Sequence, residues 1–365
     1  MRSYNVIDLF SGCGGFSNGF EQAGFKVLLG IDIWGDALRT FKENHSEAQI
    51  LEKSLTDVSG NEILDLIGKK KTDIDVIIGG PPCQGFSISG KRILDDPRNQ
   101  LYKSYVRILR DIRPKIFVME NVLGLIKLFN GEAKDAIVES LENSGYVVKY
   151  QILMASDYGV PQNRKRVFFV GVRSDIFNSE FIFPETTHGE NKKLPYLTCK
   201  DAISDLPLLN TSNGGELLEY TSQPNTDYQK IMRMNSPFIY NHTATIHKEK
   251  TVKTIALVPD GGNYKSLPEH LKDSRRVNIA WTRMNSNKPC FTIDTGHNHH
   301  FHYKANRVPT VRESARIQSF SDDFIFHGTK TSQLKQVGNA VPPLLSKNIA
   351  TVVYKMLEGV ENNDL

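Results

Sequence analysis

The chain has 365 residues, more than one compact hydrophobic core usually holds, so two domains are expected. Hydrophobic residues make up 39% and charged residues 24%, as in ordinary globular proteins, and no apolar run reaches the roughly 18 residues of a membrane-spanning helix. The formal net charge of +4 permits a phosphate-bearing partner without requiring one.

Strands and helices alternate in the pattern of the first half of the chain. Short apolar runs predict strands over residues 6–10, 26–31, 76–78, 116–119, 147–153 and 166–172. Helical patterns lie between them, over residues 16–23, 37–44, 102–110 and 133–143. This alternation predicts an α/β fold with a doubly wound, mostly parallel sheet.

The alternation ends near residue 183. Residues 184–305 are rich in Asn, Thr, Ser, Pro, Gly and His, which predicts a separate and less regular small domain. Helical patterns return over residues 311–320 and 344–356.

The cysteines and histidines form no metal-binding or disulfide pattern. No C-x-x-C pair occurs among Cys13, Cys83, Cys199 and Cys290, and the histidine-rich residues 297–302 lack partner ligands in a regular element. No signal-peptide pattern precedes the first apolar segment. We therefore predict no metal, reduced thiols and a cytoplasmic location.

A glycine-rich loop follows the first predicted strand and contains Gly12, Gly14 and Gly15. Glycines at a strand-to-helix turn let the backbone approach a ligand closely. Asp32 lies about twenty residues further on, where a carboxylate accepts ribose hydroxyls. The glycine-rich loop and Asp32 together predict an adenosine-type ligand, and the alternative is a purely structural turn. The spacing is not G-x-G-x-x-G, which argues against a nicotinamide dehydrogenase.

Cys83 follows Pro81 and Pro82 at the end of a predicted buried strand. The prolines restrict the backbone and would hold the thiol at the carboxyl edge of the sheet, where α/β enzymes place their chemistry. Cys83 is therefore a candidate nucleophile, and the alternative is an inert buried cysteine.

Glu120 and two arginines occupy comparable positions. Glu120 ends the predicted strand 116–119, and Arg164 and Arg166 stand at the start of strand 166–172. Side chains two apart in a strand can point to one side, so one arginine is a candidate to meet a phosphate and the other a base or a carboxylate. A surface salt bridge and a surface basic segment are the alternatives.

The order of these segments resembles the C5-cytosine DNA methyltransferase family. Gly80-Pro81-Pro82-Cys83, Glu120-Asn121-Val122 and the Q-x-R-x-R run ending at Arg166 are followed by R-E-x-x-R-x-Q and Gln-Val-Gly-Asn-Ala at residues 312–318 and 336–340. The resemblance covers residues 5–173 and 306–355. It implies a Rossmann-like class I methyltransferase with a catalytic and cofactor-binding domain over residues 1–183, completed by 306–365, and a target-recognition domain over 184–305.

The resemblance also implies a reaction. A methyl group would pass from S-adenosylmethionine to C5 of a flipped cytosine in a short duplex sequence, through a covalent Cys83–C6 intermediate, leaving S-adenosylhomocysteine. Glu120 would act at N3 of the base and Arg166 would hold its O2, with Arg164 supporting the cysteine loop or a phosphate.

Further residues are implied by position. The cofactor would meet Phe10, Gly12, Gly14, Gly15, Asp32, Ile33, Leu55, Leu101, Asn339 and Ala340. DNA would meet Ser87, Ser89, Arg283 and Thr292, with Arg283 contacting a base edge in the major groove. The family often has Asp where Ser54 stands and an aromatic residue where Ile33 stands, so both adenine contacts depart from its pattern.

The expected partner is double-stranded DNA, and the family's usual bacterial setting adds a restriction endonuclease that acts separately on the same site. We expect a monomer. Two alternatives remain: an RNA cytosine-5 methyltransferase of the same fold, and a catalytically silent nucleic-acid adaptor. The long segment 184–305 favours DNA, because RNA-acting relatives carry a smaller insert.

Overall fold

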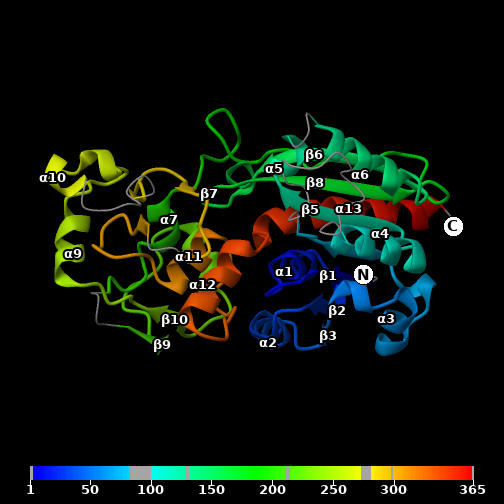
Figure 1. The fold of residues 1–365 in the computed structure, drawn as a ribbon, viewed down its shortest axis with the longest axis horizontal. Coiled ribbons are helices and arrows are strands. Elements are labelled where there is room, and N and C mark those ends of the chain that lie inside the picture. The colour runs from blue at the N-terminus through cyan, green and yellow to red at the C-terminus, as the bar shows by residue number, and fades with distance from the viewer. Residues whose placement is uncertain are drawn as a thin grey trace. The chain divides into compact units, whose positions relative to one another are not determined.

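The chain forms two compact units. The computed structural model describes residues 3–82, 100–127, 131–209, 214–272, 281–296 and 299–363. Unit 1 comprises Met1–Met154, Lys165–Glu185 and Pro343–Leu365, and unit 2 comprises Ala155–Arg164 and Thr186–Pro342. Figure 1 shows the elements of both units, coloured along the chain.

Unit 1 contains a seven-stranded sheet with the order β3-β2-β1-β4-β5-β8-β6. Neighbouring strands from β3 to β5 are parallel, whereas β8 is antiparallel to both β5 and β6. The strands are β1 (Asn5–Leu9), β2 (Lys26–Asp32), β3 (Gln49–Glu52), β4 (Val76–Gly79), β5 (Ile116–Val122), β6 (Tyr146–Met154) and β8 (Lys165–Arg173). The predicted doubly wound, mostly parallel sheet is confirmed.

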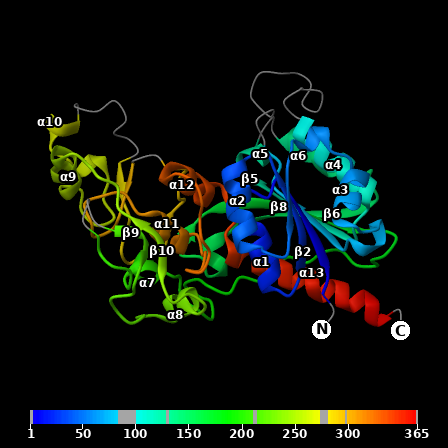
Figure 2. The same ribbon diagram turned by 90° about the horizontal axis from the view of Figure 1, so that it is seen from below.

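Helices cover both faces of this sheet, as Figure 2 shows for α1 and α13 on one side and α3 and α4 on the other. The helices are α1 (Gly15–Gln22), α2 (Gly35–Asn44), α3 (Gly60–Ile67), α4 (Gln100–Ile112), α5 (Gly124–Lys127), α6 (Glu132–Glu142) and α13 (Pro343–Asn363), with short 3-10 turns η1 (Leu55–Asp57) and η2 (Lys71–Asp73). Ile7, Ile77 and Phe117 of the central strands are fully buried, so the core lies on the sheet faces.

Every strand and helix predicted from the sequence is present, with ends that move by at most three residues, except that α13 extends seven residues beyond its predicted end. The sequence patterns did not predict β3, α3, α5 or α12 (Lys330–Asn339). The side chains of β3 are mostly exposed at the sheet edge, so the strand lacks the apolar run that marks its neighbours. The Ser59–Glu62 capping box at the start of α3 was an available signal.

Unit 2 is built from short elements. Its helices are α7 (Cys199–Ile203), α8 (Asp227–Arg233), α9 (Glu249–Ala256), α10 (Glu269–Lys272), α11 (Val311–Ile317) and α12, with short turns η5 (Ala155–Tyr158) and η6 (Tyr264–Ser266). Three strand pairs accompany them: β9 (Gly214–Leu218) with β10 (Ile239–Thr243), β11 (Thr282–Arg283) with β13 (His300–Phe301), and β7 (Gln162–Asn163) with β12 (Cys290–Phe291).

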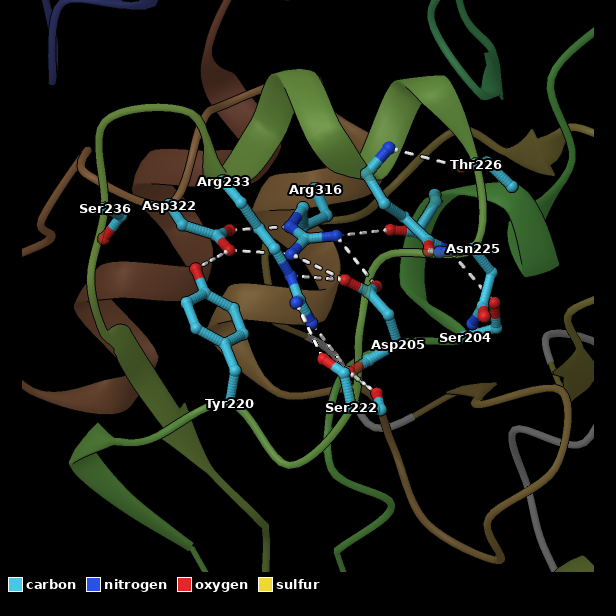
Figure 3. A network of polar contacts seen from close by, with 12 residues as sticks. Ser204, Asp205, Tyr220, Ser222, Asn225, Thr226, Arg233, Ser236, Arg316 and Asp322 are labelled. Carbon is cyan, nitrogen blue, oxygen red and sulfur yellow. Dashed lines mark hydrogen bonds and ion pairs between the residues drawn. The ribbon is translucent and has the colours of Figure 1, made fainter.

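Buried ion pairs hold the centre of unit 2 (Figure 3). The Arg316 guanidinium lies between Asp322, with Nε–Oδ1 at 2.6 Å, and Asp205, with Nη1–Oδ1 at 3.0 Å, and all three side chains are fully buried. Arg233 forms a second ion pair with Asp205, with Nε–Oδ2 at 2.7 Å. Buried charges are tolerated only when paired, so each of these groups depends on the others.

The same network explains where the R-E-x-x-R-x-Q segment belongs. Arg312 donates to backbone carbonyls of Tyr240, Ser321 and Phe324, all in unit 2. Although burial favours its protonated form, attraction to Arg307 holds the pKa of Glu313 well below its usual range.

We expected residues 306–365 to complete the sheet domain, but by their contacts residues 306–342 lie in unit 2.

Gly19 supplies a test of the packing between α1 and α13. A Cβ placed there would lie 2.3 Å from the Ser346 Cβ and 2.5 Å from the Pro343 carbonyl oxygen. We expect Gly19→Ala to lower the free energy of unfolding by ~1–3 kcal/mol in urea denaturation, because the contact has no room for a methyl group.

Gly359→Ala in α13 is the matched control, because a Cβ there meets nothing within 4 Å. It should stabilise the helix by ~0.5–1 kcal/mol. Equal effects of the two substitutions would contradict the described packing.

Candidate active site

The carboxyl end of β4 lies beside the carboxyl end of β5 in unit 1. After β4 the chain continues through Gly80 to Pro81, whose carbonyl oxygen accepts a 2.8 Å hydrogen bond from the buried Asn121 side-chain amide. A Cβ at Gly80 would lie 3.2 Å from Glu120 Oε2, so glycine permits this close approach. Asn121 thus anchors the segment that leads to Cys83, which lies outside the described residues, as do Ser87 and Ser89.

Glu120 and Arg166 form an ion pair at this edge. The antiparallel register of β5 and β8 sets Val122 opposite Arg166, which brings the Arg166 Nε within 2.9 Å of Glu120 Oε1. The two side chains are only 15% and 13% exposed, so the pair is largely shielded from water. An exposed salt bridge, one alternative from the sequence, does not fit this burial.

Arg164 occupies a different environment from Arg166. It lies in unit 2, outside β8, and its fully buried guanidinium donates from Nη2 to the Gly338 carbonyl at 2.8 Å. The expectation that both arginines stand at the start of one strand is therefore wrong for Arg164. The alternation of side chains along a strand does not apply to a residue that precedes it.

The loop after β1 contains three residues in the left-handed backbone region. Phe10, Gly12 and Gly14 all have positive φ, at 63°, 52° and 93°. The Asp32 carboxylate accepts hydrogen bonds from the backbone N–H groups of Gly12 at 2.9 Å and Ile33 at 2.7 Å. Asp32 therefore fixes the loop to the end of β2.

The other predicted cofactor residues differ in exposure. Ile33 is 70% exposed, although it is a large apolar side chain next to Asp32. Leu55 is buried, Leu101 is partly buried, and Gly15 opens α1. Ser54 caps η1 through its hydroxyl and bonds the Thr56 hydroxyl at 2.7 Å. Asn339 and Ala340 end α12 in unit 2, and their predicted cofactor contact stays a prediction.

The family model for "C-5 cytosine-specific DNA methylase" matches residues 4–355. The chain belongs to this family. It is 39% identical to type II methyltransferase M.DdeI of Desulfomicrobium norvegicum, over 98% of this chain and 90% of that protein. It is 41% identical to type II methyltransferase M1.HphI of Haemophilus parahaemolyticus, over 97% and 87%. The chain is a DNA (cytosine-5-)-methyltransferase, so the RNA-acting and adaptor alternatives are set aside.

Solved structures support the same fold. The crystal structure of a prophage-encoded chain assigned as a DNA modification methyltransferase (E. coli) matches with a TM-score of 0.80 and 29% identity, over 98% of this chain and all of that one. The S. pombe Dnmt2 methyltransferase matches with a TM-score of 0.59 and 17% identity, over 98% and 99%. At 17% identity the second likeness concerns the fold alone.

Within the described ranges of this methyltransferase, no helix is long and apolar enough to cross a bilayer. In the same ranges, no three His, Cys, Asp or Glu side chains gather as a metal site.

Arg283 does not have the surroundings of a DNA-contacting residue. Its side chain is buried and donates to the backbone carbonyls of Val258 at 2.6 Å, Ile255 at 2.7 Å and His302 at 2.9 Å. These bonds join the end of α9 to the chain after β13, so we correct the prediction of a base contact to a structural role. Thr292, by contrast, is exposed, and its hydroxyl donates to the Asn163 carbonyl at 2.9 Å.

Asp8, which no sequence pattern singled out, lies in β1, the strand that leads into the glycine loop. The carboxyl is fully buried and accepts a 2.6 Å hydrogen bond from the Ser17 hydroxyl. Burial raises its pKa to about 8, and repulsion from Asp32 adds to the effect. A lone acidic residue inside an apolar strand was the available signal. Burial likewise raises the pKa of the nearby Cys13 thiol to about 12, which makes that cysteine a poor nucleophile.

The raised pKa of Asp8 predicts a pH dependence of stability. The folded chain binds this proton more tightly than the unfolded chain, where the pKa is near 3.8. The stabilising effect is therefore complete below about pH 4 and lost as pH rises toward 8. We expect Asp8→Asn, which cannot titrate, to become steadily more stable relative to the wild type between pH 4.5 and 8 in urea denaturation.

Asp65→Asn, at an exposed position of α3, controls for the change of charge. A stability difference between wild type and Asp8→Asn that stays constant over this pH range would show that Asp8 does not carry the proton.

Proposed function

We propose that this methyltransferase transfers a methyl group from S-adenosylmethionine to C5 of a flipped cytosine in a short duplex DNA sequence, through a covalent bond between Cys83 and C6. The observation that carries the proposal is the shielded Glu120–Arg166 pair beside the Asn121-anchored segment Pro81–Pro82. Cys83 is the next residue in the chain.

Cytosine C5 needs activation before it attacks a methyl group. The Cys83 thiolate would add to C6, which forms the S–C6 bond and moves the ring electrons toward C5 and N3. S-adenosylmethionine, when bound, supplies the electrophilic methyl group and leaves as S-adenosylhomocysteine. Loss of the C5 proton to water and expulsion of the Cys83 thiolate would then restore the aromatic ring.

Glu120 and Arg166 would stabilise the activated ring. A carboxyl that shares a proton with N3 offsets the charge that develops there, and a guanidinium beside O2 orients the base. Their 2.9 Å contact keeps both groups at one edge of the sheet before the base arrives. Arg164 would act indirectly, since its guanidinium is directed to the Gly338 carbonyl.

The loop after β1 fits an adenosine-containing ligand. The Asp32 carboxylate accepts backbone bonds from Gly12, Ile33 and Trp34, and its two oxygens, with about four lone pairs, retain capacity for one ribose hydroxyl. The exposed Ile33 side chain supplies an apolar surface for adenine. Phe10, Gly12, Gly14, Gly15, Leu55 and Leu101 complete the proposed set in unit 1.

The target carbon of duplex DNA lies inside the base stack, so the cytosine must leave it, at a cost of a few kcal/mol. We propose that residues 184–305 supply target recognition, with Thr292 facing DNA, and that Ser87 and Ser89 contact DNA from the loop after Cys83. We further propose a bacterial cytoplasmic protein that acts as a monomer. The type II names of the relatives support a separate endonuclease for the same site.

Bisulfite sequencing of DNA from cells that express the protein tests this function. We expect 5-methylcytosine at one short recurring sequence, and its absence in cells that express Cys83→Ser, because a hydroxyl is a far weaker nucleophile than a thiolate. Cys199→Ala, at a buried cysteine of unit 2, should retain the modification. Methylation by Cys83→Ser would exclude the covalent route.

A duplex with 5-fluorocytosine at the mapped position tests the intermediate directly. Fluorine does not leave as the C5 proton does, so the Cys83 adduct should persist after methyl transfer. We expect a protein–DNA species that survives denaturing electrophoresis with wild type and is missing with Cys83→Ser. A wild-type enzyme that turns over the natural site yet forms no such species would contradict the mechanism.

A further inference from the structure

Gln162 lies where three segments that are distant in the sequence meet. Its side chain is completely buried in unit 2. The amide Oε1 accepts a 3.0 Å hydrogen bond from the Ile293 backbone N–H, and the Nε2 donates to the Gln318 side-chain oxygen and, at 3.4 Å, to the Ile317 carbonyl. Both ends of one amide are therefore used to join different parts of the chain.

The first connection concerns the segment that carries Thr292. β12 pairs in parallel with β7, so that Cys290 lies opposite Gln162 and Phe291 opposite Asn163. The Ile293 N–H bond to Gln162 and the Thr292 hydroxyl bond to the Asn163 carbonyl continue this pairing beyond the short ladder. Residues 290–293 are thus held against residues 162–163 along their whole length.

The second connection runs through Gln318. This residue closes the R-E-x-x-R-x-Q segment, and its Nε2 donates to the Ala340 carbonyl at 2.7 Å. Gly338, two residues earlier, accepts the hydrogen bond of Arg164. The Gln162–Gln318 contact therefore links the end of α12 to residues 162–164. This short segment contains Arg164 and binds the Thr292 hydroxyl through Asn163.

The covalent chain connects Gln162 to the two arginines. Gln162 precedes Arg164 by two residues and Arg166 by four, and Arg166 pairs with Glu120. We propose that Gln162 is a positioning residue that fixes residues 290–293 relative to the arginine-bearing segment, so that target discrimination and methyl transfer depend on one buried amide. This inference rests on the proposed function and adds a residue role to it.

An amide suits this position because it donates and accepts at once. A carboxylate could accept from Ile293 but could not donate to Gln318, and an apolar side chain could do neither. Loss of the amide would leave buried polar partners at Ile293 and Gln318 without their bonds, which favours a shift of the two segments.

Gln162→Met tests the proposal, since methionine has a similar size and shape without the hydrogen bonds. The probe is unmethylated plasmid DNA treated with purified full-length protein and examined by bisulfite sequencing. We expect the ratio of methylation at the wild-type site to methylation at sites with one changed base pair to fall about tenfold. The single-turnover rate at the wild-type site, measured at saturating DNA, should fall as well.

Gln229→Met is the matched control. Gln229 is an equally buried glutamine of unit 2 whose amide bonds to Asn225, Asp201 and Ser204. A general loss of stability would affect both variants, but only Gln162→Met should change the site ratio. Combining Gln162→Met with Gln318→Met should reduce the ratio little further, because both changes remove the same contact.

The outcomes of these measurements distinguish a failure of the proposed function from a failure of the positioning role of Gln162. If wild-type protein methylates no cytosine, the proposed function fails. If wild type methylates a defined sequence and Gln162→Met shows the same site ratio and rate as Gln229→Met, the positioning role is overturned and the function stands.

Discussion

The hydrogen-bonded ladder between β5 and β8 is the constraint on which the candidate site depends. Its register sets Arg166 diagonally across from Glu120 at the point where β4 also ends. An antiparallel strand in an otherwise parallel sheet allows this, because its first residues lie beside the last residues of its neighbour. The beginning of one strand and the end of another thereby supply the two charged groups of a single pair.

Unit 2 depends on a different interaction, the pairing of buried charges. Arg316, Asp322 and Asp205 are fully buried together, and Glu313 lies between Arg307 at 2.8 Å and His302 at 3.7 Å. Unit 2 also has an apolar cluster around Trp281 and Phe301, and the directional bonds of the buried charges add specificity to this packing. The charged residues of R-E-x-x-R-x-Q thus maintain the shape of unit 2.

Much of the sheet and part of the site were predictable because their signals are local. Apolar runs marked the central strands, and Pro81-Pro82-Cys83 and Glu120 followed strand ends whose placement at one edge is a rule of parallel sheets. The errors concern residues whose environment is not local. Arg283 looks like a surface cation in the sequence, yet carbonyl groups from residues up to 28 positions away surround it.

The α/β fold, the order of the chemical segments and the family resemblance could be predicted before the structure, since they follow from the pattern of side chains along the backbone. The folded chain was needed to show that Arg166 pairs with Glu120 whereas Arg164 binds the end of α12, and that Gln162 joins residues up to 156 positions away. The reason is geometric. A buried polar side chain must form hydrogen bonds with whichever backbone or side-chain group the fold brings near, and the residues next to it in the sequence do not indicate which group that is.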